Sequence, residues 1–150
     1  MTQTLPENIN PGLSILKSID INASPLKVWE VLTNPEMIRQ YFTGAETITN
    51  WEIGTEIVFI HWYDEKEFRN KGVILQFLPN QVLSYTYWTA FSNTDDKPEN
   101  YTTITYTLEE ANGKTKLSLL QANFKNRTWY EGLQTGWDMV LDKIRAIAEK

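Results

Sequence analysis

Hydrophobic and polar residues alternate along much of the chain, which is the pattern of β-strands with one buried face. In residues 13–21, apolar side chains occupy every second position except Lys17. The same alternation predicts six further strands, at residues 46–51, 56–63, 68–77, 82–88, 101–108 and 115–121. We therefore expect a sheet of about seven strands, with apolar side chains on one face and mostly Thr, Ser, Lys and Glu on the other.

Short turns separate most of these segments. Residues 52–55, 64–66 and 78–81 contain the glycine, proline or polar residues that are typical of hairpin turns. Asn112-Gly113 is the strongest signal, because both residues tolerate the positive φ of a two-residue hairpin. Such turns join neighbouring antiparallel strands, and only residues 92–100 form a longer polar loop.

Helical spacing replaces the alternation in three places. Ser24 precedes Pro25 and Asn34 precedes Pro35, and each pair combines an N-cap with a proline at the first helical position. These signals predict two short helices after the first strand. Residues 128–149 predict one long amphipathic helix. Its apolar residues at three- and four-residue spacing are Leu133, Trp137, Val140, Leu141, Ile144 and Ile147.

Two glycines lie inside the predicted long helix. Gly132 and Gly136 each cost about 1 kcal/mol relative to alanine at such positions. Close approach of the helix backbone to the sheet or to a ligand would explain them, and we expect that approach.

The order of elements predicts the fold. One antiparallel sheet must curl around one long helix to bury the apolar faces of both. The expected fold class is α+β, a helix-grip fold in a single domain of residues 1–150. Its first twelve residues are expected to be a loose polar leader.

Four short segments carry a family resemblance. They are Ala23-Ser24-Pro25-Leu26-Lys27-Val28-Trp29-Glu30-Val31-Leu32-Thr33-Asn34-Pro35-Glu36, then Lys71-Gly72-Val73-Ile74 with Pro79 and Leu83-Ser84-Tyr85, then Gly113-Lys114-Thr115-Lys116-Leu117-Ser118-Leu119, and Gly136-Trp137-Asp138-Met139-Val140-Leu141. Together they resemble the SRPBCC superfamily of START or Bet v-like helix-grip proteins. Within it, the chain is similar to homologues of the activator of the 90-kDa heat-shock protein ATPase. The resemblance implies the same fold; some superfamily members bind lipids, hormones or polyketides, and a few are enzymes.

Composition narrows the classes of function. The formal net charge is −5 and no basic run occurs, which argues against nucleic-acid binding. No apolar stretch approaches the roughly 20 residues that cross a bilayer, so we expect no membrane insertion. The chain has no cysteine and one histidine, so neither a disulfide nor a metal site is expected. We expect a cytoplasmic protein without a cofactor.

Aromatic residues make up 13% of the chain and suggest the candidate site. Aromatic strand faces with a few polar tips form either the wall of a small-molecule pocket or a solid core with tyrosine hydroxyls at its rim. Trp29 and Trp137 also suit packing in the core, whereas Trp88, Phe91 and Trp129 are expected near a cavity mouth. The candidate cavity residues are Phe59, His61, Tyr63, Tyr85, Tyr87, Tyr106, Gln121 and Trp137.

Three functions remain open at this point. The first is a binding module for a small hydrophobic or aromatic ligand. The second is an enzyme, such as a cyclase, dehydratase or hydrolase, in which His61 acts with a tyrosine or a carboxylate. The third is a protein-interaction module, including stimulation of a chaperone ATPase, with a chaperone the least favoured partner and a homodimer left open. We assign no catalytic residue, and the charges of residues 64–71 are expected to be solvated.

Overall fold

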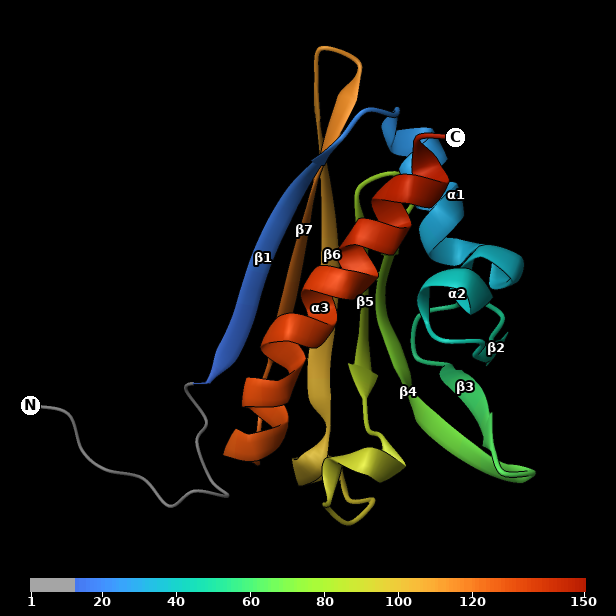
Figure 1. Cartoon of the computed structure of the whole chain (residues 1–150), viewed down its shortest axis with the longest axis vertical. Helices are drawn as coiled ribbons and strands as arrows, with labels where there is room; N and C mark the ends of the chain where they lie inside the picture. The colour runs from blue at the N-terminus through green and yellow to red at the C-terminus, as the bar shows by residue number, and fades with distance from the viewer. Residues whose placement is uncertain (1–12) are drawn as a thin grey trace, which may run out of the picture.

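The computed structural model describes residues 13–150, so the predicted leader lies outside the described residues. Seven antiparallel strands form one curved sheet in the order β1-β7-β6-β5-β4-β3-β2, with the long helix α3 across its concave face (Figure 1). The strands are β1 (Ser14–Ile21), β2 (Glu46–Ile48), β3 (Glu56–Tyr63), β4 (Lys66–Leu78), β5 (Val82–Tyr87), β6 (Thr102–Ala111) and β7 (Lys114–Ala122). The helices are α1 (Pro25–Thr33), α2 (Pro35–Tyr41) and α3 (Arg127–Ala148), with short 3-10 turns η1 (Ala90–Ser92) and η2 (Pro98–Asn100). The predicted helix-grip architecture is confirmed.

Side-chain caps begin the helices where the sequence predicts. The Ser24 hydroxyl accepts from the Lys27 amide at 3.3 Å, and the Asn34 side chain accepts from the Glu36 amide at 2.9 Å. These oxygens satisfy amides that lack a partner within the first turn. Figure 1 shows α1 and α2 beside the C-terminal half of α3, where they close one side of the grip.

Some strands end near residues with positive φ, and there the alternation of apolar and polar residues predicts the wrong strand end. The predicted strand at residues 46–51 stops at Ile48, and Trp51 has φ 62°. The turn before β4 uses only Asp64 and Glu65, with φ 49° and 65°, so β4 begins at Lys66. β6 similarly continues to Ala111, directly before the predicted Asn-Gly turn.

The core lies between α3 and the concave face of the sheet. Alternate residues of β6 and β7 are buried there, as the pattern predicts, and they meet Leu141 and Ile144 of α3. Most polar side chains of the same strands face outward, whereas Thr102, Thr115 and Gln121 are buried. Burial of this apolar area is the main term that stabilises the fold.

Gly72 allows β4 and β5 to approach unusually closely. A Cβ atom built on Gly72 would lie 1.5 Å from the carbonyl oxygen of Thr86. The two strands pair through Lys71 and Trp88 at this point, and their register shifts farther along, between Ile74 and Gln76. Only glycine fits, which gives the Lys71-Gly72-Val73-Ile74 segment a structural reason.

Candidate functional site

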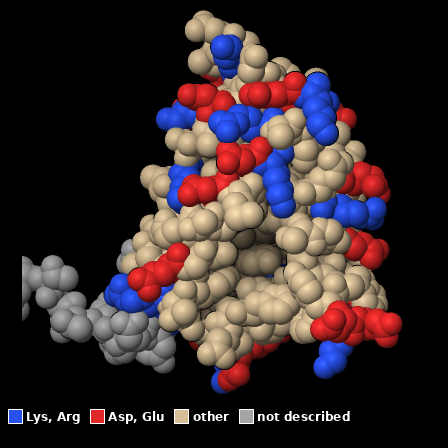
Figure 2. All heavy atoms as spheres, viewed as in Figure 1, with Lys and Arg blue, Asp and Glu red and all other residues tan. Residues whose placement is uncertain are grey.

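A cavity of about 370 Å3 lies between α3 and the concave face of the sheet. Figure 2 shows a hollow on this face, surrounded by uncharged side chains, while most of the charged side chains on this face lie above it or at its margins. Its volume is within the range of about 300–1,000 Å3 that is usual for small-molecule sites. The strands, the end of α2, η1 and α3 all contribute to its wall.

The structure brings five of the eight candidate residues to this cavity. They are His61 and Tyr63 of β3, Tyr87 of β5, Gln121 of β7, and Trp137 of α3.

The other three candidates lie in the core and do not line the cavity. Phe59 is covered by the rings of Phe42 and Tyr87, at centroid distances of 5.4 and 5.9 Å. Tyr106 packs against Trp137 at 6.1 Å, and Tyr85 packs against Phe59 at 5.7 Å. Ring-on-ring packing therefore fills the part of the grip that these three residues occupy.

One stripe of α3 forms the helical wall. Trp129, Leu133, Gly136 and Val140 recur at four, three and four residues and all line the cavity. The spacing puts them on one face of the helix.

The helix glycines do not approach the sheet closely, so of the two expected explanations only an approach to a ligand remains, and only for Gly136. A Cβ on Gly132 would meet nothing within 4 Å, because Gly132 faces solvent. A Cβ on Gly136 would meet only Leu133 of the same helix, at 3.5 Å, and would otherwise point toward the cavity. The absence of a side chain at Gly136 thus leaves cavity space open.

Gln121 and Trp137 form a fixed polar point in the inner wall. The Trp137 indole N–H donates to Gln121 Oε1 at 2.7 Å, and Gln121 Nε2 donates to the Thr102 hydroxyl at 3.0 Å. The Thr102 hydroxyl in turn donates to the carbonyl of Tyr87 at 3.0 Å. Buried polar groups that are satisfied in this way hold their rotamers and keep the cavity wall rigid.

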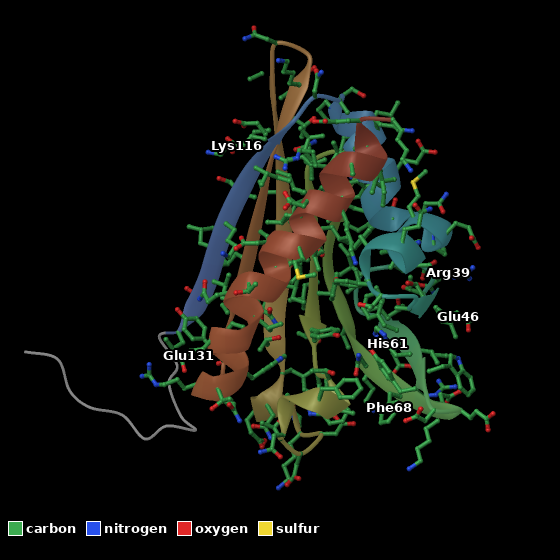
Figure 3. All side chains as sticks on the ribbon, viewed as in Figure 1. Arg39, Glu46, His61, Phe68, Lys116 and Glu131 are labelled. Atoms are coloured by element: carbon green, nitrogen blue, oxygen red, sulfur yellow. The ribbon has the colours of Figure 1, made fainter. Side chains whose placement is uncertain are left out.

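His61 projects into the grip and is half-buried (Figure 3). Its ring stacks on Tyr63 at 6.4 Å with an interplanar angle of 11°. Burial lowers the pKa of His61 below its usual value of 6.5, so the imidazole is neutral at physiological pH. Among the described residues, Nδ1 has no hydrogen-bond partner, and the cavity lining contains no carboxylate. Of the partners that the enzyme hypothesis allows for His61, the lining supplies the tyrosines Tyr41, Tyr63 and Tyr87 but no carboxylate.

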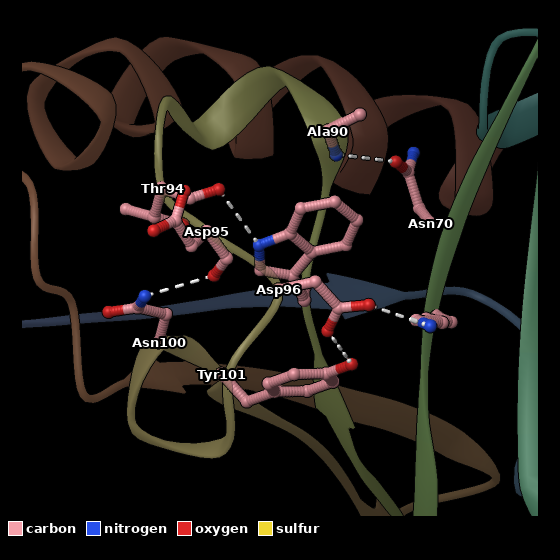
Figure 4. Close-up of polar contacts among 9 residues, drawn as sticks. Asn70, Ala90, Thr94, Asp95, Asp96, Asn100 and Tyr101 are labelled. Carbon is pink, nitrogen blue, oxygen red and sulfur yellow. Dashed lines mark hydrogen bonds and ion pairs between the residues drawn. The ribbon is translucent and has the colours of Figure 1, made fainter.

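Tyr87, Thr89 and Asn70 form a second polar edge. Burial raises the pKa of Tyr87 well above its usual value, and hydrogen bonds with Thr89 and Asn70 oppose this only partly. The Tyr87 phenol is therefore neutral. Asn70 Oδ1 also accepts from the amide of Ala90 at 3.2 Å, which fixes η1 against β4 (Figure 4).

Salt-bridged side chains anchor the loop between β5 and β6. Lys71 Nζ lies 2.7 Å from Asp96 Oδ2, and the Tyr101 hydroxyl donates to Asp96 Oδ1 at 2.6 Å (Figure 4). Hydrogen bonds from Lys71 and Tyr101 hold the pKa of Asp96 below its usual value. The loop carries Phe91 to the cavity rim, where its ring meets Tyr63 at 5.7 Å.

Of the three aromatic residues expected near the mouth, two line the cavity. Phe91 and Trp129 do so, whereas the Trp88 indole donates to the Thr94 carbonyl at 3.3 Å, away from it. Sequence reasoning missed the residues supplied by the end of α2, by β4 and β6, by Thr89 after β5, and by α3. They are Tyr41, Phe42, Thr43, Asn70, Thr89, Ile104, Leu133, Gly136, Met139, Val140 and Lys143. Helical spacing from Trp137 was the one signal that could have found those on α3.

Two kinds of feature are missing from residues 13–150. None of the helices in this range is long and apolar enough to cross a membrane. The same residues contain no group of three or more His, Asp or Glu side chains placed to hold a metal ion.

Comparisons with known proteins agree with this fold. A protein from Cytophaga hutchinsonii, solved in solution, is 30% identical, with a TM-score of 0.79 over 94% of this chain and 97% of that chain. A crystal structure of a Mesorhizobium loti protein shares 23% identity, with a TM-score of 0.75 over 90% and 96% of the two chains. The Aha1 dimer from Colwellia psychrerythraea shares 18% identity, with a TM-score of 0.71 over 91% and 96%.

A search of curated proteins finds no match. The family described as activator of Hsp90 ATPase homolog 1-like protein matches residues 22–149, almost the whole of the described fold. The match includes the two capped helices α1 and α2, the close approach of β4 and β5 at Gly72, and the cavity-lining face of α3. The chain belongs to the activator of Hsp90 ATPase homolog 1-like family.

Proposed function

We propose that the protein binds a small hydrophobic or aromatic molecule in the cavity between α3 and the sheet. The observation that carries the proposal is a cavity of about 370 Å3 whose wall is mainly aromatic and aliphatic, with a few neutral polar groups. Such a wall favours apolar ligands, and its polar tips fix their orientation. Binding of this kind needs no cofactor and no catalytic residue.

The geometry supports binding better than catalysis. His61 is the only histidine, and the cavity lining provides no carboxylate to orient or protonate it. General acid–base chemistry needs two groups of complementary role within reach of the reacting atoms. The neutral imidazole instead offers a hydrogen-bonding nitrogen to a ligand.

Two variants of α3 test the proposal. Gly136→Leu places a side chain in the cavity, whereas Gly132→Leu makes the same change on the solvent-facing side of the same helix. Both replace a helical glycine and thus remove the same propensity cost, so only their positions differ. The probe is N-phenyl-1-naphthylamine, an uncharged aromatic molecule that fluoresces when it leaves water.

Wild type and Gly132→Leu should bind the probe with similar affinity. Gly136→Leu should bind it about 5–150-fold more weakly, because overpacking a formed site costs about 1–3 kcal/mol. Equal probe affinity in all three proteins would show that the cavity is not the binding site. No binding to wild type, by this probe or by a library of lipids and planar aromatics in a thermal-shift screen, would contradict the proposal itself.

A protein partner is the second candidate, and an exposed apolar pair favours it. β1 ends the sheet, so within the described residues one side of it has no strand neighbour. Leu16 on β1 is 73% exposed and lies opposite Leu120, which is 38% exposed. A second copy packed against the face of the sheet at this edge would cover both side chains. Sedimentation should then detect a dimer that Leu16→Glu dissociates, and a monomer at all concentrations would contradict this candidate.

A further inference from the structure

The cavity lining carries a single formal charge. Among the described residues of its wall, Lys143 is the one basic side chain of the Lys or Arg type, and no aspartate or glutamate is among them. The other polar groups are neutral, including the Tyr87 phenol and the His61 imidazole, whose burial disfavours the charged form. The described lining therefore carries one basic side chain and no acidic one, in a chain whose formal net charge is −5.

Within residues 13–150, Lys143 has no carboxylate at ion-pair distance. Other basic side chains of this range do form salt bridges: Arg145, two residues farther along α3, lies 2.7 Å from Asp142. Lys143 is an exposed residue and also lines the cavity, so it lies at the rim.

From this arrangement we infer that the ligand is an amphipathic anion, with an apolar body inside the cavity and a carboxylate or similar anionic group at Lys143. The inference rests on the proposed function and specifies its ligand class. An unpaired anion inside the apolar wall would lose its hydration without compensation. At the rim, the anion keeps part of its hydration and gains an opposite charge.

The positions of Gly136 and Val140 on α3 allow a ligand to lie in this orientation. Both line the cavity on the same stripe of α3, and Lys143 follows Val140 by three residues, near one turn of helix. An apolar body against this stripe therefore brings a short polar head toward the ammonium group. The wall on the other side contributes neutral aromatic rings, which suit the apolar body.

Two fluorescent probes with one skeleton test the inference. N-phenyl-1-naphthylamine is uncharged, and 1-anilinonaphthalene-8-sulfonate adds one sulfonate to the same rings. The test protein is Lys143→Gln, and the matched control is Lys116→Gln, which removes one exposed lysine from β7, far from His61 (Figure 3). Each protein is titrated with both probes, at low salt and in about 0.5 M NaCl, where charges are screened beyond a few ångströms.

Lys143→Gln should weaken binding of the sulfonate probe by about 3–10-fold, as expected for one partly solvated charge pair. It should change the affinity for the uncharged probe by less than about twofold, and Lys116→Gln should change neither. High salt should lower the affinity of wild type for the sulfonate probe and should have little further effect on the affinity of Lys143→Gln.

The outcomes separate the inference from the proposed function. If both probes bind, Gly136→Leu weakens both, and Lys143→Gln leaves the ratio of their affinities unchanged, the anionic ligand class is overturned and the binding cavity stands. If Gly136→Leu weakens neither probe, the cavity is not the site and both are overturned.

Discussion

Replacing Gly72 by alanine tests the closest backbone approach in the sheet. The new Cβ would lie 1.5 Å from the Thr86 carbonyl oxygen, whereas real Cβ atoms essentially never have a contact shorter than 3.0 Å. The two strands must therefore separate by about 1.5 Å or more. That shift breaks the two backbone hydrogen bonds between Lys71 and Trp88, at 2.9 and 2.8 Å, and the bond from the Val73 amide to the Thr86 hydroxyl, at 2.9 Å. Three neutral hydrogen bonds at about 1 kcal/mol each predict a loss of about 3 kcal/mol in the free energy of unfolding.

Urea unfolding followed by tryptophan fluorescence measures this loss. Gly132→Ala is the matched control, because its Cβ meets nothing within 4 Å and alanine favours the helix by up to about 1 kcal/mol. The control should therefore be as stable as wild type or more stable. A Gly72→Ala protein within about 1 kcal/mol of wild type would refute the steric reasoning, since the strands would then have room to separate at little cost.

Three further predictions concern the site. Gln121→Leu leaves the buried Trp137 indole N–H without its acceptor at 2.7 Å and should lower stability by about 1–3 kcal/mol in urea unfolding; a Gln121→Leu protein as stable as wild type would contradict a stabilising role for this bond. The pKa of His61 is lower in the folded state than its unfolded value of 6.5, so the folded protein keeps its full stability above pH 6.5 and loses part of it as the pH falls through the folded pKa. His61→Gln should make the free energy of unfolding depend less on pH below 6.5, and an unchanged dependence would contradict the burial argument. Asp96→Asn removes the salt bridge to Lys71 and should speed hydrogen exchange in residues 89–101 while global stability falls by about 1 kcal/mol or less; unchanged exchange there would show that this pair does not hold the loop.

The sequence predicts the elements well because their signals are local. The caps at Ser24 and Asn34, the Asn112-Gly113 turn and the alternation in β6 and β7 each depend on a few neighbouring residues. Strand ends were less accurate where a non-glycine residue adopts positive φ, as Trp51 does. Alternation does not signal that conformation.

The site is harder to predict because alternation gives the face of a residue and not its depth. Phe59, His61 and Tyr63 share one face of β3, yet Phe59 is in the core, His61 is half-buried and Tyr63 is 47% exposed. Their depth depends on where α2 and α3 cross the sheet. The sequence pattern does not predict the place of Lys143 either. Near the end of an amphipathic helix a lysine suits the helix dipole, and only the packed structure places it at the cavity rim.

The indole N–H resonances of the six tryptophans give the most direct test of the central claim, that a small apolar molecule binds between α3 and the sheet. Trp129 and Trp137 line the cavity, whereas Trp29, Trp51, Trp62 and Trp88 do not. Two-dimensional 1H–15N spectra recorded during titration with N-phenyl-1-naphthylamine should therefore show large shifts for Trp129 and Trp137 and little change for the other four. Shifts confined to Trp62 or Trp88, or no shift in any indole at saturating probe, would contradict the account.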